Sequence, residues 1–182
     1  MSNFDKQLIA KNFSAAASHY DRHAFIQRTI GDRLFERLEL MSIKPKQVLD
    51  VGCGTGHYTQ ALLEKYPRAK VFGIDLAEGM ISAAKQNNSR YKSWFGLNQC
   101  EYLVADMDKL PFADQSVDLV FSNLAFQWSV NPKATFQEFV RVLKPNGLLM
   151  YSTLGPDTLK ELRSAWQLVD QQQHVNQFID MH

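Results

Sequence analysis

The segment Val48–Thr59, "VLDVGCGTGHYT", places a short apolar run directly before three glycines at alternate positions, Gly52, Gly54 and Gly56. An apolar run bounded by glycines is typical of a buried strand. Glycine is favoured where the backbone takes a positive φ or must approach a ligand closely. The pattern therefore predicts a strand, a tight ligand-binding turn and a following helix.

The same alternation of short apolar runs and helical patterns continues along the chain. We expect strands at residues 47–51, 70–75, 100–106, 116–123 and 147–155. We expect helices within residues 4–41 and at residues 57–66, 77–87, 131–143 and 158–170. Strands that alternate with helices predict an α/β fold, with a mostly parallel sheet covered by helices on both faces in three layers.

The 182 residues suit one domain with three parts. We expect a helical cap at residues 1–45, a ligand-binding core at 46–155 and the start of a substrate-side helical region at 156–182. Two short apolar patterns of helical spacing in the cap are interpreted as core packing: Leu8, Ile9, Phe13 and Ala17, and Ile26, Ile30, Leu34 and Leu38.

The composition excludes several classes of protein. The formal net charge is +1, so nothing suggests nucleic acid or a membrane surface as a partner. No apolar run approaches the ~20 residues of a membrane span, and the amino-terminal residues do not resemble a secretory signal. Two cysteines, Cys53 and Cys100, are too few for a disulfide framework, which predicts a reducing cytoplasm. We predict no metal site.

Polar residues recur where the predicted strands end. Asp50, Asp75, Asp106 and Asn123 all stand at or near these ends. In open parallel sheets the ligand lies beyond the carboxyl ends of the strands, near the switch in strand order. The four residues therefore predict one binding site.

Asp50 is the residue that we use to choose the ligand of the glycine turn. A dinucleotide would set its pyrophosphate against this turn, where a carboxylate at ~4 Å costs on the order of 4 kcal/mol at an effective dielectric of about 20. The turn also lacks Lys and Arg. A cation such as S-adenosylmethionine suits it better. The alternative is that Asp50 only caps the turn through backbone N–H groups.

Asp75 and Asp106 would bind the nucleoside. An acid about 20 residues after the glycines can accept both ribose hydroxyls, and the alternative is that Asp75 caps the next helix. Asp106 would accept the adenine amino group while the Met107 N–H reaches a ring nitrogen; the alternative is a turn residue. Two apolar residues, Leu76 and Met80, would pack on the base, and the alternative is that they belong to the core.

Five segments identify a family. "VLDVGCGTG", "GIDLAEGM", "ADMDKLPF", "DLVFSNLAFQW" and "VLKPNGLL" resemble, in order and spacing, the motifs of class I S-adenosylmethionine-dependent methyltransferases. The resemblance implies a Rossmann-like fold, with S-adenosyl-L-methionine as methyl donor and S-adenosyl-L-homocysteine as product. It places the cofactor on Gly52, Cys53, Gly54, Asp75, Asp106 and Met107, with Asn123 and Leu124 at the methionine end. Cys53 is otherwise a small residue packed against the turn.

Longer segments resemble a narrower family. "IAKNFSAAASHYDRHAFIQ", "SNLAFQW" and "STLGPDTLKELRSAWQLVDQQQHVNQFIDMH" are similar to the malonyl-acyl-carrier-protein O-methyltransferases of biotin synthesis. The resemblance implies methyl esterification of the free carboxylate of a malonyl thioester, carried by acyl carrier protein or coenzyme A.

This chemistry needs few catalytic groups. A carboxylate with a pKa of about 4 is already ionised, so no general base is required and positioning dominates. Candidates for positioning are Tyr20, Gln127 and Trp128. Candidates for binding the substrate carboxylate are Arg163, Arg22 and, third, Lys160. His174 and Asn176 are candidates for a substrate lid.

The broad fold has two further strands, which this chain lacks. We therefore expect an incomplete protein whose exposed sheet edge favours self-association or marginal stability. Two other functions stay open: a methyltransferase for another small molecule, such as a quinone precursor, and a cofactor-binding module without activity. A nicotinamide dehydrogenase is opposed by Asp50.

Overall fold

The structure is a computed structural model that describes residues 5–91 and 100–169. The chain begins with helical segments, as predicted for the cap. They are α1 (Lys6–Ala16), α2 (Tyr20–His23), α3 (Phe25–Glu36) and the 3-10 turn η1 (Arg37–Leu40). Asp5 caps α1, because its carboxylate accepts the N–H groups of Gln7 and Leu8.

Five parallel strands follow and form one sheet in the order β3-β2-β1-β4-β5. They are β1 (Gln47–Val51), β2 (Lys70–Asp75), β3 (Cys100–Val104), β4 (Val117–Asn123) and β5 (Leu143–Ser152). The connecting and flanking helices are α4 (His57–Lys65), α5 (Glu78–Tyr91), η2 (Phe126–Trp128), α6 (Pro132–Val142) and α7 (Lys160–Gln167). The five predicted strands are confirmed. The strand order reverses between β1 and β4, which is where such sheets bind ligands.

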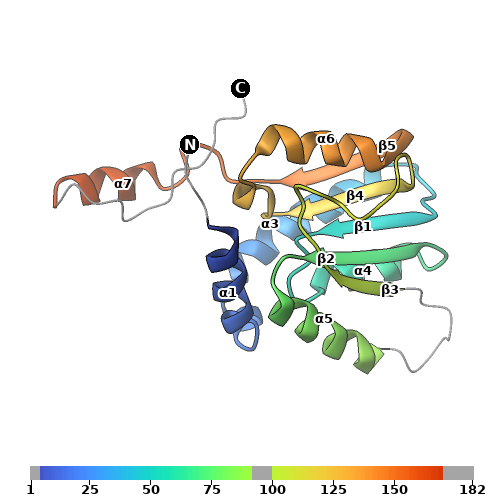
Figure 1. Cartoon of the computed structure of the whole chain (residues 1–182), viewed down its shortest axis with the longest axis horizontal. Helices are drawn as coiled ribbons and strands as arrows, with labels where there is room; N and C mark the ends of the chain where they lie inside the picture. The colour runs from blue at the N-terminus through green and yellow to red at the C-terminus, as the bar shows by residue number, and fades with distance from the viewer. Residues whose placement is uncertain (1–4, 92–99, 170–182) are drawn as a thin grey trace.

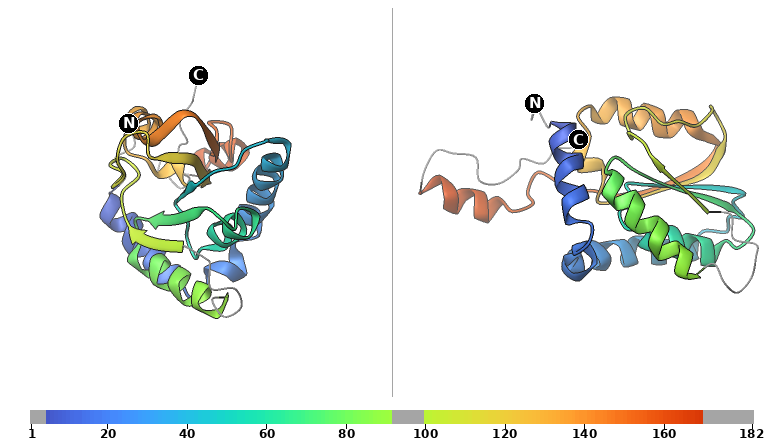
Figure 2. Two further views of the ribbon diagram at one scale, coloured as in Figure 1. Left: turned by 90° about the vertical axis from the view of Figure 1, so that its right-hand side faces the viewer. Right: turned by 60° about the horizontal axis from the view of Figure 1, so that its bottom comes forward.

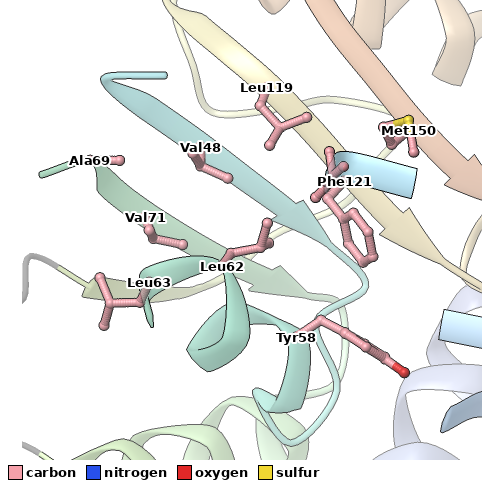
Figure 3. Packing of buried hydrophobic residues seen from close by; sticks show 10 residues of the cluster. Val48, Tyr58, Leu62, Leu63, Ala69, Val71, Leu119, Phe121 and Met150 are labelled. Atoms are coloured by element: carbon pink, nitrogen blue, oxygen red, sulfur yellow. The ribbon is translucent and has the colours of Figure 1, made fainter. Parts of the chain in front are cut away.

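Apolar side chains cover both faces of the sheet, so the predicted three layers are confirmed. One core packs α3, η1 and α4 against the sheet and contains Val48, Leu62 and Phe121 (Figure 3). The opposite core contains Leu49 and Phe139 and packs α6 against the other face. Successive side chains of a strand point to opposite faces. This alternation decides where the polar residues of β1 can reach.

Arg141 of α6 fixes the loop that follows β3. Its guanidinium binds the carboxylate of Glu138 at 2.7 Å and the backbone carbonyls of Leu110 and Phe112 at 3.0 and 2.8 Å. A guanidinium offers five N–H donors in a rigid arrangement. It therefore holds the loop in place immediately after the predicted adenine-binding residues.

The cap is less embedded than its apolar pattern predicts. No residue of α1 is fully buried, Leu8 is 54% exposed, and Ile26 at the start of α3 is 64% exposed. The core-packing interpretation is therefore wrong for these two residues, although Leu38 is buried as expected. For Leu8 the physical reason is position, because α1 lies beside the carboxyl ends of the strands rather than on a face of the sheet (Figure 1). Ile26 stands at the start of α3 and lines the cavity at the strand ends.

The last described helix, α7, extends away from the sheet in Figure 1 and in the right-hand view of Figure 2. Its apolar residues Leu162 and Trp166 are exposed. Within residues 5–91 and 100–169, no helix has the length and apolarity needed to cross a membrane. Cys53 and Cys100 are not joined in a disulfide. The three-part division of the chain, the cytoplasmic location and self-association stay predictions.

Candidate functional site

A cavity of about 350 Å³ lies at the carboxyl ends of the strands. It brings together most of the residues that the sequence singled out. They are Tyr20, Gly52, Gly54, Asp75, Leu76, Met80, Asp106, Met107, Asn123, Leu124, Gln127 and Trp128. The strands place these residues side by side because the carboxyl ends of parallel strands share one edge of the sheet.

The glycine turn is shaped by three positive φ angles, 71° at Gly52, 54° at Gly54 and 87° at Gly56. The N–H groups of Gly52 and Cys53 donate to the carbonyl of Ile74 at 2.8 and 2.9 Å, which ties the turn to β2. A side chain is disfavoured at such φ values. The alternate glycines are therefore required by the backbone of the turn.

Asp75 joins the glycine turn to the start of α5. Its carboxylate accepts the Gly54 N–H at 2.9 Å and the Ala77 N–H at 2.8 Å, and it also lines the cavity. Burial raises the pKa of Asp75, against the effect of these backbone bonds. Because each carboxylate oxygen can accept two hydrogen bonds, binding to a ribose remains compatible with the bonds at the start of α5 that the capping alternative predicts.

Both carboxylate oxygens of Asp106 already have partners within the protein. One oxygen accepts the Asp108 N–H at 2.9 Å, as the turn alternative predicts, and the other lies 2.6 Å from the Lys6 ammonium group. Lys6 also lies 2.5 Å from Asp108. No motif in the sequence pointed to Lys6, because it is 100 residues from Asp106 and stands on α1.

The structure places Asp50 behind the glycine turn, outside the large cavity. Val48 and Asp50 are two residues apart, so both point to the face that α4 covers. There the Asp50 carboxylate is buried and accepts the Thr59 hydroxyl at 2.6 Å. Burial, more than the nearby Asp75 charge, raises its pKa to about 7 despite the bonds from Thr59. Asp50 therefore stabilises the first turn of α4, and its part in binding the cofactor stays a prediction.

Replacing Asp50 with asparagine should change how stability depends on pH. Between pH ~4 and ~7 folded Asp50 holds a proton that the unfolded chain has lost, so the wild-type free energy of unfolding should fall by up to about 1.4 kcal/mol per pH unit. Asp50→Asn lacks this loss. Denaturant unfolding at pH 5, 6, 7 and 8 should show the variant gaining on the wild type up to pH ~7 and then levelling. A constant difference for Asp50→Asn would contradict the prediction.

A smaller cavity of about 50 Å³ adjoins the large one. It is lined by Asp50 and Cys53, the two predicted cofactor residues that the large cavity lacks. Arg28 and Asp21 also line it, with Arg28 Nη2 3.3 Å from Asp21 Oδ1. The Cys53 thiol is buried, and burial raises its pKa well above the usual value. Cys53 thus packs against the turn, as its alternative reading predicts. Arg28 is a second residue that the sequence analysis did not single out.

The last residue of β4 and the residues that follow it form another wall of the large cavity. Asn123 donates to the Gln27 carbonyl at 2.9 Å and accepts the Ser152 hydroxyl at 2.7 Å. The Leu124 N–H donates to the Ser152 carbonyl at 3.1 Å, at a positive φ of 49°. Gln127 in turn donates to the Leu124 carbonyl at 2.6 Å. These bonds hold the backbone after β4 rigidly against the cavity.

Aromatic side chains close the cavity from the side of the cap. Phe13 of α1 packs edge-to-face against Trp128, with ring centroids 5.4 Å apart, and against Tyr20 at 6.4 Å. Burial raises the pKa of Tyr20, and the charge of Asp75 adds to this effect. Tyr20 is therefore a neutral hydrogen-bond donor at the wall of the cavity. The sequence pattern of the strands did not indicate that Phe13 lines the cavity.

The predicted partners of the substrate carboxylate do not reach the cavity. The Arg163 guanidinium donates to the backbone carbonyls of Pro156 and Thr158. Arg22 is exposed on α2, and Lys160 pairs with Asp157 at 3.7 Å. None of the three lines either cavity described above. His174 and Asn176 lie outside the described residues.

A metal site is not found in the part of the chain that the structure describes. There, no three His, Cys, Asp or Glu side chains are grouped so that they could hold a metal ion.

The sheet order, the two covered faces and the cavity at the switch point define a doubly wound α/β domain that binds a small ligand beyond its strand ends. The chain belongs to the methyltransferase domain family, whose model matches residues 49–151. Its fold is the Rossmann-like fold of class I methyltransferases. The structure of a SAM-dependent methyltransferase from Aquifex aeolicus is similar, with a TM-score of 0.64 and 26% identity over 79% of this chain and 74% of that one.

Two curated relatives are similar over nearly the whole chain. Both are named malonyl-[acyl-carrier protein] O-methyltransferase. The protein from Gallionella capsiferriformans is 48% identical over 98% of this chain and 61% of its own length. The protein from Legionella pneumophila is 44% identical over 96% of this chain and 59% of its own length. The chain thus spans about three fifths of the length of these relatives.

Proposed function

We propose that the chain binds S-adenosylmethionine in the large cavity and carries the methyl-donor half of an enzyme that esterifies the free carboxylate of a malonyl thioester. The observation that carries the first part is a single cavity shared by the glycine turn and by Asp75 and Asp106, at the carboxyl ends of three neighbouring strands. The malonyl thioester as substrate is supported by the named relatives, which align with nearly the whole of this chain.

The charge of the cavity favours a cationic ligand. Among the described lining residues, one lysine stands against three aspartates, a formal charge of −2 when all four are ionised: Lys6, Asp75, Asp106 and Asp108. The lysine is paired with two of these aspartates. A diphosphate would meet uncompensated negative charge, whereas a sulfonium and an ammonium group would be attracted. Asp50 does not line this cavity and contributes nothing to this count.

Each part of the cofactor has suitable partners in the two cavities. We assign the ribose hydroxyls to Asp75 and the adenine to Asp106 and the Met107 N–H, with Leu76 and Met80 against the ring. The amino-acid end would extend along the glycine turn toward the small cavity, where Arg28 suits a carboxylate and Asp21 an ammonium group. The smaller cavity thus offers one positive and one negative side chain beside the glycine turn.

The chain's own residues would act by positioning. The bound cofactor supplies an activated methyl group on its sulfonium. Because the malonyl carboxylate is already ionised at neutral pH, no residue needs to remove a proton. Tyr20, Gln127 and Trp128 line the cavity and would orient the carboxylate toward the methyl group and keep water out.

Transfer of a radiolabelled methyl group tests the substrate. The assay offers malonyl thioesters of acyl carrier protein and of coenzyme A to this chain and to a longer chain of the relatives' length. We expect product from the longer chain, and the relatives' names favour the carrier-protein thioester. Absence of product from both chains on both thioesters would reject the substrate. Tight binding of S-adenosylhomocysteine with no transfer to either thioester would favour the silent cofactor-binding module, and transfer to a quinone precursor would favour the other open alternative.

A further inference from the structure

The first residue of α1 bridges two carboxylates at the edge of the cavity. The Lys6 ammonium group lies 2.6 Å from Asp106 Oδ2 and 2.5 Å from Asp108 Oδ2, and all three side chains line the cavity. We propose that Lys6 is a latch that holds α1 over the cavity, and that a ligand amino group takes its place at Asp106. The second half of this proposal rests on the proposed function, because it assumes an adenine at Asp106.

The helix that Lys6 holds has few other attachments, and they lie further along it. The Ser14 hydroxyl accepts the Gly79 N–H at 3.1 Å. The two helices approach so closely here that a Cβ added at Gly79 would lie 2.6 Å from the Ser14 carbonyl oxygen. Phe13 packs against Trp128. No residue of α1 is fully buried. The carboxyl-terminal half of α1 is therefore attached by packing and the amino-terminal end by Lys6, with Ile9 between them at the cavity.

The two carboxylates hold Lys6 unequally. Asp108 accepts hydrogen bonds from Ser129 at 3.0 Å and from Thr135, both of which are buried. Burial opposes its ionisation, but the bonds from Lys6, Thr135 and Ser129 outweigh this effect and lower the pKa of Asp108. Its side chain is 13% exposed, against 35% for Asp106. Asp108 is thus the fixed anchor and Asp106 the exchangeable partner.

Because Asp108 holds Lys6 more firmly than Asp106 does, Lys6 can stabilise α1 both without and with a bound ligand. An ammonium group has three N–H donors, so Lys6 can bind both carboxylates when no ligand is present. When an amino group of the ligand donates to Asp106, Lys6 keeps its bond to Asp108. Helix α1 then stays over the bound ligand while Asp106 accepts a hydrogen bond from the adenine amino group. Partial burial opposes the charged form of Lys6, but its bonds to Asp106 and Asp108 outweigh this effect and raise its pKa, so the latch is charged at neutral pH.

Removal of the latch should accelerate ligand release. We expect Lys6→Met to raise the dissociation rate of S-adenosylhomocysteine about fivefold to tenfold, which corresponds to the loss of a partly exposed ion pair of about 1 kcal/mol. Lys6→Arg should restore slow release. Lys11→Met, an exposed lysine on the same helix, is the matched control and should behave as the wild type. Stopped-flow displacement measures all four proteins, and higher salt should accelerate release only where position 6 is charged.

A second measurement needs no ligand. Hydrogen exchange of the amides near the start of α1 should be faster in Lys6→Met than in the wild type and in Lys11→Met, because the amino-terminal end opens more often. Unchanged exchange in Lys6→Met would overturn the latch even if no protein bound S-adenosylhomocysteine. Unchanged release with tight binding would overturn it as well. Faster exchange together with absent binding would reject the proposed cofactor and leave the latch supported.

Discussion

Replacing Asp75 with asparagine should weaken the affinity for S-adenosylhomocysteine by about 30-fold to 1000-fold. The carboxylate accepts the N–H groups of Gly54 and Ala77 and is assigned to the ribose. An amide turns one of its acceptor oxygens into an NH₂ group, which faces a donor. Hydrogen bonds to charged groups contribute about 1.5–3 kcal/mol each, so a total loss of about 2–4 kcal/mol gives this range.

Isothermal titration calorimetry measures the effect on affinity. Glu39→Gln makes the same chemical change at an exposed position of η1 and should leave affinity unchanged. The melting temperatures of both variants should be recorded, because Asp75 also holds the glycine turn. An affinity of Asp75→Asn within threefold of the wild type would show that the ribose lies elsewhere.

Replacing Gly52 with alanine should destabilise the fold by about 2–5 kcal/mol and abolish cofactor binding. Gly52 has a φ of 71°, at which a side chain is strained, and its new Cβ would overlap the Cβ of Ala125. Strained backbone costs about 1–3 kcal/mol, and overpacking of a buried position costs a similar amount. Equilibrium unfolding in urea measures the loss of stability.

A second substitution separates the two causes. In Gly52→Ala with Ala125→Gly the overlap is relieved but the positive φ remains, so about half of the lost stability should return. Gly155→Ala adds a Cβ where no atom lies within 4 Å and should change stability by less than about 0.5 kcal/mol. A single variant Gly52→Ala as stable as the wild type would contradict the geometry of the turn.

Local patterns in the sequence were sufficient for the sheet and for one side of the site. Short apolar runs that alternate with helical patterns predicted every strand, and parallel strands bring their carboxyl ends to one edge of the sheet. Asp75 and Asp106 were therefore expected at the same edge, and they lie near one another because β2 and β3 are neighbours in the sheet. The direction of Asp50 followed from the same alternation of faces, since it shares a face with Val48. Asp50 therefore lies behind the turn, where its carboxylate accepts the Thr59 hydroxyl.

The partners contributed by the cap were beyond such patterns. Lys6 meets Asp106 across 100 residues of sequence, and a lone lysine in a helix has no spacing that marks it. Arg163 looked suitable for a carboxylate by residue type alone, but its guanidinium is occupied by the carbonyls of Pro156 and Thr158. Arg28 was overlooked although it lines the small cavity. Residue type indicates what a side chain can bind, and its neighbours in space decide whether it is free to do so.

By itself the sequence determined the strands, the glycine turn and the acids at the strand ends, because periodicity and backbone strain act over a few neighbouring residues. The tertiary structure alone decided that α1 closes the cavity, that Lys6 is shared between Asp106 and Asp108, and that the cavity carries excess negative charge. These features depend on contacts between segments far apart in the chain. The packing of the cap against the strand ends creates them.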